Sequence, residues 1–264
     1  MNQSENPEPV VDGTPDDDAR LFPRVTAYRF RRGTLRPGQQ RNWEQHWPRY
    51  GQNVSDTVVD PQELFGRTAP VVVEIGSGTG TSTAAMAAAE PEIDVIAVEV
   101  YQPGLAQLLG MIVREGLENV RMIRGDGVDV LTNMIAPDSL TGVRVFFPDP
   151  WPKARHHKRR LLQSGTFALI SSRLRPGGVL HVATDHADYA EWIGETGDAE
   201  PTLERLGTGT GTQTDTDTGT EPDTGTGSAA GHVPFSLDRP VTKFEGKGLQ
   251  EERVIHEFLW RRAT

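Results

Sequence analysis

A single carboxylate lies between two prolines in the stretch Phe146-Phe147-Pro148-Asp149-Pro150-Trp151-Pro152. The proline rings fix the backbone on both sides of Asp149 and remove two N–H groups from its surroundings. The next eight residues, 153–160, which we call the basic run, hold five lysines or arginines, two histidines and no acid. The chain as a whole carries a net charge of −10, so this positive run is local. An oriented carboxylate beside an anion-binding surface is the chemistry that these residues offer.

The basic run has two readings that the sequence leaves open. Its cations are either a solvated surface at the start of a helix or contacts to RNA phosphates; they are Lys153, Arg155, Lys158, Arg159 and Arg160. Trp151 either stacks on a base or packs against the protein. His156 and His157 lack a second histidine pair or a carboxylate at ligand spacing, so the sequence predicts no metal site.

A second set of chemically useful residues surrounds the glycine loop Glu74-Ile75-Gly76-Ser77-Gly78-Thr79-Gly80. The loop separates a short apolar run from an alanine-rich segment, which places it where a strand meets a helix. Glycines such as Gly76 and Gly78 let the backbone approach a ligand closely at the carboxyl edge of a sheet. Glu99 ends the next apolar run, 19 residues after Gly80. A carboxylate at that place accepts both ribose hydroxyls of a nucleotide cofactor.

This geometry suits NAD and S-adenosylmethionine equally well. The pattern GxGxG after an acid, in place of GxGxxG, favours S-adenosylmethionine. Asp126, in Arg124-Gly125-Asp126-Gly127, follows the third strand run and is placed to reach the adenine edge. An Asp-Gly pair is also an ordinary turn, so both interpretations of Asp126 stay open.

Alternating strand and helix patterns must position these residues. Apolar, β-rich runs predict strands at 70–78, where the run ends in glycines, and at 93–99, 119–125, 143–149, 178–185 and 252–260. Helical patterns lie between them at 81–90, from Pro103 to Gly116, at 158–172 and near 187–193. Apolar strands that alternate with helices predict a parallel sheet covered on both faces. Asp149 and Asp185 then fall at the carboxyl ends of two strands, facing the ligand crevice.

Composition divides the 264 residues into one domain and two polar segments. Residues 1–19 have almost nothing to bury and are predicted to be a disordered acidic tail, followed by a single domain over 20–264. The Gly-Thr-Asp repeats of 207–228 predict a flexible insertion. The acidic charge lies in segments 1–18 and 194–231, which leaves the remainder near +3, since −10 + 6 + 7 = +3. Within that remainder, residues 20–49 hold eight arginines against Glu44.

The chain lacks cysteine and any apolar run of transmembrane length. Disulfides, thiolate metal sites and membrane spans are therefore not expected, and neither is a signal peptide. A cytoplasmic protein is the expectation. The sequence leaves the oligomeric state open.

Several segments closely resemble the bacterial tRNA guanine-N7 methyltransferases. The most specific are VRVFFPDPWPKARHHKRRLLQ (143–163) and RPVTKFEGKG (239–248). FRRGTLRPGQQ (30–40), VVVEIGSGTG (71–80), IAVEV (96–100) and LRPGGVLHVATD (174–185) match as well. The resemblance covers about 24–194 and 235–262. The chain departs from the pattern at the 207–228 insertion, in its acidic first 18 residues and at Lys247, which replaces an arginine.

The resemblance implies a Rossmann-like class I methyltransferase with a mostly parallel, seven-stranded sheet. It implies transfer of a methyl group from S-adenosylmethionine to N7 of guanine-46 in the tRNA variable loop. Carried over by motif, Glu74, Gly76, Gly78, Glu99, Asp126 and Asp149 lie around the donor, and Asp149 is the catalytic residue. Lys153, Asp185, Thr242, Lys243, Phe244 and Glu245 bind the substrate, while Arg31 and Arg32 extend the tRNA footprint.

The chemistry of the acceptor limits what these carboxylates do. Guanine N7 carries a lone pair and no proton, so its attack on a sulfonium methyl needs no general base. Asp149 and Asp185 are both candidates for holding the guanine edge and favouring the positive charge that develops on the purine. Two alternative functions remain at this point. They are a methyltransferase for another RNA position and a tRNA-binding protein without turnover.

Overall fold

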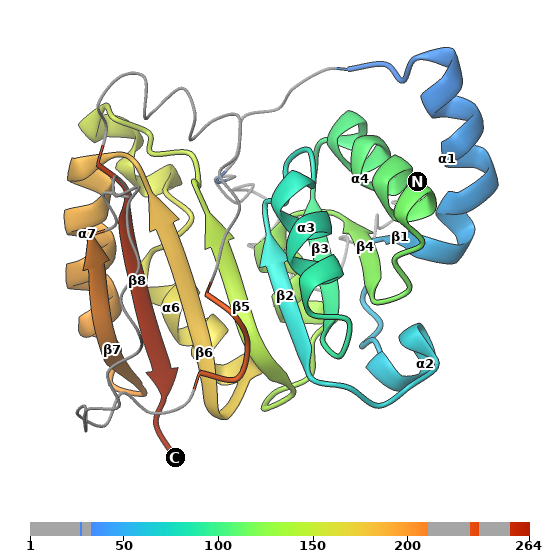
Figure 1. The fold of residues 1–264 in the computed structure, drawn as a ribbon. Helices are drawn as coiled ribbons and strands as arrows, with labels where there is room; N and C mark the ends of the chain where they lie inside the picture. The colour runs from blue at the N-terminus through green and yellow to red at the C-terminus, as the bar shows by residue number, and fades with distance from the viewer. Residues whose placement is uncertain (1–26, 28–32, 211–232, 238–253) are drawn as a thin grey trace, which may run out of the picture.

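The computed structural model describes residue 27 and residues 33–210, 233–237 and 254–264, with the backbone alone for 207–210. The described residues build an eight-stranded sheet with helices on both faces (Figure 1). The strands are β1 Gly51–Asn53, β2 Val71–Ile75, β3 Asp94–Glu99, β4 Val120–Arg124, β5 Leu140–Phe146, β6 Leu174–Thr184, β7 Leu203–Thr210 and β8 His256–Arg262. The helices are α1 Pro37–Tyr50, α2 Pro61–Phe65, α3 Thr81–Ala89, α4 Gln102–Glu115, α5 Gly127–Asn133, α6 Ser164–Arg173 and α7 Ala187–Asp198, with a 3-10 helix, η2, at Ala154–Arg159.

The strand order is β1-β4-β3-β2-β5-β6-β8-β7. Pairings from β1 to β6 are parallel, and β8 runs antiparallel to both β6 and β7. The carboxyl ends of β2 to β6 therefore share one edge, at the top of Figure 1. The predicted mostly parallel α/β sheet is confirmed. It has one strand more than expected, because the short β1 joins the outer side of β4.

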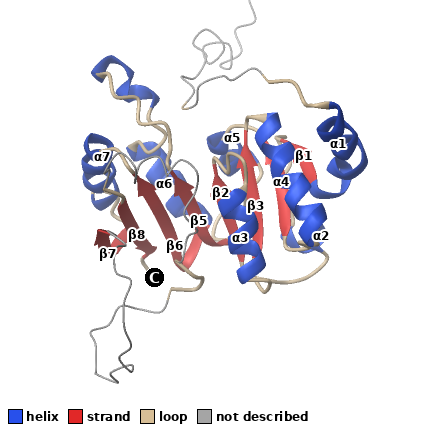
Figure 2. Cartoon of the chain, turned by 45° about the horizontal axis from the view of Figure 1, so that its top comes forward, coloured by secondary structure: helices blue, strands red, loops and turns tan. Residues whose placement is uncertain are grey.

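Two apolar layers hold the helices on the sheet. On one face, α1, α3 and α4 bury alanines, leucines and tryptophans against β3 and β4. On the other face, α5, α6 and α7 pack against β2, β5, β6 and the start of β7. Figure 2 turns the carboxyl edge forward and shows α3 and α4 in front of the sheet, with α5 and α6 behind it. In the described ranges, every helix is too short or too polar to cross a bilayer.

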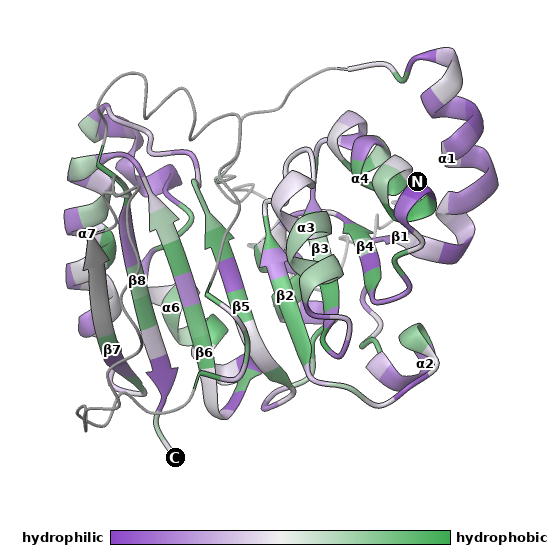
Figure 3. Cartoon of the chain, viewed as in Figure 1, coloured by the Kyte–Doolittle hydropathy of each residue, from purple (hydrophilic) through white to green (hydrophobic). Residues whose placement is uncertain are grey.

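Polar residues interrupt the apolar strands at the centre of the sheet, where Figure 3 shows purple bands in β2 and β5. Glu74 and Arg144 are register partners on these strands, and both are buried. Arg144 donates to Glu90, at the end of α3, over 3.0 Å. Glu90 in turn accepts the N–H of Ser236. A buried guanidinium thus links the sheet to α3 and to the segment 233–237.

The segment 233–237 covers one face of the sheet. Phe235 is 6% exposed and packs with Val72, Ile93 and Val179. A Cβ on Gly142 would lie 2.2 Å from the Phe235 ring, so this strand needs glycine for the ring to approach. The aromatic ring therefore fixes where the chain re-enters the described fold after residue 232.

Three predicted boundaries were wrong. Strand β5 begins at Leu140 and ends at Phe146, so Asp149 lies three residues beyond the strand. The helix predicted at 158–172 is divided into η2 and α6, with residues 160–163 between them. The insertion predicted at 207–228 starts inside β7, where residues 207–210 pair with β8. Its remaining residues lie outside the described ones, as does the predicted acidic tail.

Candidate active site

The glycine loop joins β2 to α3 at the carboxyl edge. Gly76, Gly78 and Gly80 have φ angles of 79°, 58° and 75°, in the left-handed region that favours glycine. The N–H groups of Gly76 and Ser77 both donate to the carbonyl of Val98 on β3, over 2.8 and 3.2 Å. A Cβ on Gly76 would meet no heavy atom within 4 Å. The loop is therefore held by β3, and the space beside Gly76 is open to a ligand.

Glu99 ends β3 beside this loop, as predicted. Its Oε2 accepts the N–H of Gly78 at 2.9 Å, and its Oε1 accepts those of Val100 and Tyr101 at 2.7 and 2.8 Å. The carboxylate is half-buried and is oriented by three backbone donors. Its position at the strand end fits a nucleotide ribose, and that role stays a prediction.

Asp126 is the N-cap of α5. Its Oδ1 accepts the N–H of Val128 at 2.9 Å, which satisfies one free donor of the first helical turn. The Asp-Gly pair therefore begins a helix rather than an ordinary turn. The cap uses only Oδ1 of the two carboxylate oxygens of Asp126. It therefore does not test the predicted contact with an adenine edge.

Glu74 is buried in β2, two residues before Gly76. Burial raises the pKa of its carboxyl, which Arg144 and the Thr83 hydroxyl partly offset and Glu99 reinforces. Its Oε2 has no hydrogen-bond partner among the described residues. A buried polar atom beside an open loop fits a ligand that presents a donor or a positive charge there.

Asp149 is carried by residues 147–152, which we call the PDPW loop. Phe147 and Trp151, two residues before and after Asp149, have φ angles of 49° and 44°. Left-handed aromatic residues are strained by roughly 1–3 kcal/mol each, so surrounding contacts must hold the loop in place. The N–H of Phe147 donates to the carbonyl of Ala183 on β6 at 2.8 Å. Asp149 and Asp185, which follows β6 directly, are both half-buried at this edge.

Trp151 packs against the protein, which settles one open reading for this structure. The side chain is 4% exposed, and its Nε1 donates to the carbonyl of Ala27 at 2.8 Å. The guanidinium of Arg159 lies 3.7 Å above the ring, and His156 meets it edge-on at 5.8 Å. The indole face is thus covered by a cation, where stacking on an RNA base would need it open.

The structure does not favour the phosphate role predicted for Arg160. Its side chain is buried, at 2% exposure. Nε donates to the carbonyl of Pro150 at 3.0 Å, and Nη2 pairs with the carboxylate of Asp188 on α7. The last cation of the basic run therefore points into the protein. Sequence reasoning missed it because Arg160 lies just after η2, and the buried member of a run of like charges carries no mark in the sequence.

The rest of the basic run remains at the surface. Lys153, Arg155 and Lys158 are exposed, and Arg159 is half-buried on Trp151. These cations extend from the PDPW loop over η2, so a positive surface adjoins Asp149. The other predicted substrate residues, Arg31, Arg32, Thr242, Lys243, Phe244 and Glu245, lie outside the described residues.

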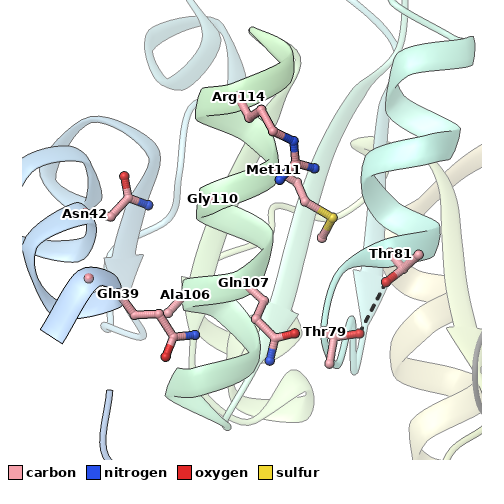
Figure 4. Close-up of a pocket in the computed structure, with 10 residues that line it drawn as sticks. Gln39, Asn42, Thr79, Thr81, Ala106, Gln107, Gly110, Met111 and Arg114 are labelled. Carbon is pink, nitrogen blue, oxygen red and sulfur yellow. Dashed lines mark hydrogen bonds between the residues drawn. The ribbon is translucent and has the colours of Figure 1, made fainter. Parts of the chain in front are cut away.

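A groove of about 410 Å³ opens on the other side of the glycine loop, between α1, α4 and the start of α3 (Figure 4). Its lining is polar and small, and includes Gln39, Asn42, Thr79, Thr81, Gln107, Gly110 and Arg114. None of the predicted donor-site residues lines it. The Thr79 and Thr81 hydroxyls lie 3.4 Å apart at its inner end. In the described part of the chain, no three histidine, aspartate or glutamate side chains form a group suited to a metal ion.

A Rossmann-like sheet with a glycine loop and an acidic strand end at its carboxyl edge is common to nucleotide-cofactor enzymes, the class I methyltransferases among them. The solved structure of the 16S rRNA methyltransferase KamB has this fold, with a TM-score of 0.51 and 12% identity over 78% of this chain and 95% of that one. Residues 68–258 match the model of the family described as "Putative methyltransferase".

Similar sequences show to which methyltransferase family the chain belongs. A tRNA (guanine-N(7)-)-methyltransferase of Corynebacterium jeikeium is 54% identical over 99% of this chain and 98% of its own. A protein of the same name from Nocardia farcinica is 59% identical over 92% and 86%. The chain belongs to the tRNA (guanine-N(7)-)-methyltransferase family, which confirms the resemblance found in the sequence.

Proposed function

We propose that this protein transfers a methyl group from S-adenosylmethionine to N7 of guanine-46 in the variable loop of tRNA. The observation that carries the proposal is the arrangement at one sheet edge. The glycine loop follows β2 and Glu99 ends β3. The PDPW loop follows β5, which lies next to β2 in the sheet. Family membership supplies the acceptor, since the relatives named above are tRNA guanine-N7 methyltransferases.

The residues present fit S-adenosylmethionine. Space above Gly76, the orphaned Oε2 of Glu74 and the oriented carboxylate of Glu99 suit a ligand with a cationic part and a ribose. We assign Glu74, Gly76, Gly78, Glu99 and Asp126 to the donor, together with Asp149 from the acceptor side. When bound, the cofactor supplies an electrophilic sulfonium methyl group.

The chain itself has two tasks, orientation and charge stabilisation. Guanine N7 attacks with its own lone pair, so no side chain has to remove a proton first. A carboxylate that accepts the N1 and N2 hydrogens of guanine orients N7 and favours the cation that forms. Asp149 and Asp185 both have the position for this. We assign the catalytic role to Asp149 from the family resemblance, and contacts of Phe147 and Pro150 hold its loop.

Binding of tRNA depends on the positive surface beside that loop. Lys153, Arg155, Lys158 and Arg159 lie where phosphates of a docked RNA would approach Asp149, and phosphate contacts position the RNA without reading its sequence. We also assign Lys153 and Asp185 to the substrate, along with residues 242–245. Arg31 and Arg32 extend this footprint in the proposal.

A methyl-transfer assay on undermodified tRNA tests the function. Purified protein, radiolabelled S-adenosylmethionine and a tRNA transcript with guanine at position 46 should give label at N7 of that base. The same transcript with adenosine at position 46 should stay unlabelled. Equal labelling of both transcripts would show another RNA position. Binding of tRNA and cofactor without transfer would show a non-catalytic binding protein.

A further inference from the structure

We propose that Arg160 is a positioning residue that holds the PDPW loop, and with it Asp149, in its reactive arrangement. The proposal rests on the proposed function, because it concerns the carboxylate assigned to catalysis there. It divides the basic run into two tasks. The exposed cations face RNA, while the buried one fixes the loop beside the reacting base.

Arg160 makes two hydrogen bonds and lies against two aromatic rings. Nε donates to the carbonyl of Pro150, next to Asp149, and Nη2 pairs with Asp188 at the start of α7. The planar group also lies 4.9 Å from the ring centre of Tyr189 and 5.8 Å from that of Trp192. A phosphate contact would require this cation to leave a carboxylate and two aromatic faces, which is unfavourable for a buried charge.

The PDPW loop needs such an external contact because of its own sequence. Pro148 and Pro150 lack N–H groups, so the loop offers few backbone donors between Phe147 and Trp151. It is held through the Phe147 N–H, the Trp151 indole and the Pro150 carbonyl, which lie before and after Asp149. Pro150 is the residue that follows Asp149, and its carbonyl accepts a hydrogen bond from Arg160.

Electrostatics also place Asp149 in this neighbourhood. Burial above all raises the pKa of Tyr189; Arg160 lowers it, and the charge of Asp149 raises it in part. The Tyr189 hydroxyl accepts the N–H of Leu162 at 3.2 Å. Arg160 thus lies beside Tyr189 and bonds to the residue that follows Asp149, so a shift of Arg160 would act directly on Pro150.

Lysine cannot take the place of Arg160. A guanidinium presents donors in a fixed planar fork, so one group serves the Pro150 carbonyl, Asp188 and the Tyr189 ring together. An ammonium on a flexible stem is a point charge and keeps the ion pair at best. Arg160→Lys therefore keeps the positive charge and loses the planar set of donors. This distinguishes a positioning role from phosphate binding, which depends mainly on charge.

The test compares the single-turnover rate at saturating tRNA and donor with the salt dependence of tRNA affinity. Arg160→Lys should lower the rate about 10–100-fold, the size expected when a reacting group is displaced by about an ångström. The slope of log affinity against log salt should not change. Asp188→Asn, which removes no cation, should lower the rate in the same direction by a smaller factor.

Two matched variants give the contrast. Lys158→Gln removes an exposed charge from the same run and should flatten the salt slope by about one unit. Arg121→Gln removes another buried guanidinium, which donates to the carbonyls of Leu64, Glu118 and Val120 far from the PDPW loop. It should lower the melting temperature and leave the saturated rate at the parent value.

Three outcomes would overturn the proposal. A flatter salt slope for Arg160→Lys with an unchanged saturated rate would make Arg160 an RNA contact. If Arg121→Gln lost as much rate as Arg160→Lys, the effect of Arg160→Lys would be one of stability. If Arg160→Lys kept the parent rate and the parent salt slope, Arg160 would have no positioning role. Hydrogen exchange at Phe147 and Trp151 should rise in Arg160→Lys and not in Lys158→Gln. That readout needs no tRNA, so it tests the contact even if the parent protein fails to methylate tRNA.

Discussion

The two halves of the sheet hold their candidate functional residues in different ways. In the glycine-loop half, from β1 to β4, Glu99 and Asp126 are held by backbone N–H groups one or two residues away or on the adjoining loop. In the PDPW half, from β5 to β7, Asp149 is carried by a loop whose contacts come from distant segments. Trp151 bonds to Ala27, and Pro150 to Arg160.

The proposed function accounts for this difference by what each half would bind. A nucleotide cofactor presents hydroxyls and a base at fixed spacing, and short local turns at strand ends match it. An RNA base that enters from outside would need a carboxylate already held in one position. The strained backbone at Phe147 and Trp151 belongs to the loop that holds it. The first half should therefore control donor affinity and the second the rate of transfer.

The largest expected effect is that of Asp149→Asn in the PDPW half. The change keeps the shape of the side chain and removes its charge and one acceptor. The single-turnover rate should fall about 10²–10³-fold, as for loss of one preorganised electrostatic contact. Affinity for tRNA, dominated by phosphates, should barely move. Single-turnover kinetics and equilibrium tRNA binding measure both.

The control for Asp149→Asn is Asp138→Asn, at a left-handed position (φ 57°) that asparagine tolerates. It should transfer methyl groups at the parent rate. If Asp149→Asn also matches the parent, the loop is structural, and Asp185 becomes the candidate for holding guanine. A large loss of tRNA affinity in Asp149→Asn would break the proposed division between the halves.

The next effect in size belongs to the glycine-loop half. Glu99→Ala removes the acceptor of three backbone N–H groups and of the proposed ribose contact. Binding of S-adenosylmethionine should weaken by about 1–3 kcal/mol, roughly 5–150-fold. Titration calorimetry measures it, with Glu118→Ala on the exposed Arg49 pair as the control. Unchanged donor affinity in Glu99→Ala would contradict its assignment to the donor site.

The same contrast explains what the sequence could predict. The glycine loop, Glu99 and the alternating strands were recognisable because their function depends on residues close together in the chain. Arg160 was misassigned because its partners, Pro150 and Asp188, lie 10 and 28 residues away. Strand β7 was missed because its last residues are Gly-Thr repeats, which pair with β8 through backbone groups in spite of their low propensity.

A third prediction concerns Glu74, where the halves meet. Because burial raises its folded-state pKa above the ordinary value of 4.5, the folded protein holds this proton more tightly than the unfolded chain. Stability therefore falls as pH rises above about 4.5 toward the folded pKa, and Glu74→Gln lacks this loss. The stability of Glu74→Gln relative to the parent should increase with pH in that window. Urea unfolding from pH 4 to 8 measures it. A relative stability that decreases with pH would show that the attraction of Arg144 outweighs burial.

The smallest effect is expected for the low-complexity segment, and the fold defines how much of it can be removed. Thr210 is level with His256 and Thr184 at the carboxyl edge, while Phe235 packs at the level of Gly142 and Val179. With about 4.8 Å between strands and about 3.3 Å per residue, these ends lie about 22 Å apart. At most about 3.5 Å is covered per residue, so some seven residues are the minimum for the connection.

Deleting residues 213–222 leaves twelve residues, 211–212 and 223–232, between Thr210 and Val233, which exceeds that minimum. The melting temperature and the methyl-transfer rate should stay at the parent values, because loop closure changes little with length and Gly-Thr-Asp repeats bury little apolar area. Deleting 208–227 instead removes the end of β7, where residues 208–210 pair with β8, so the melting temperature should fall. Thermal unfolding of both variants gives the comparison. Equal stability of the two would contradict the pairing of residues 208–210 with β8. A folded 213–222 deletion with little activity would place this segment on the substrate, and the division of labour between the halves would then need a third contributor.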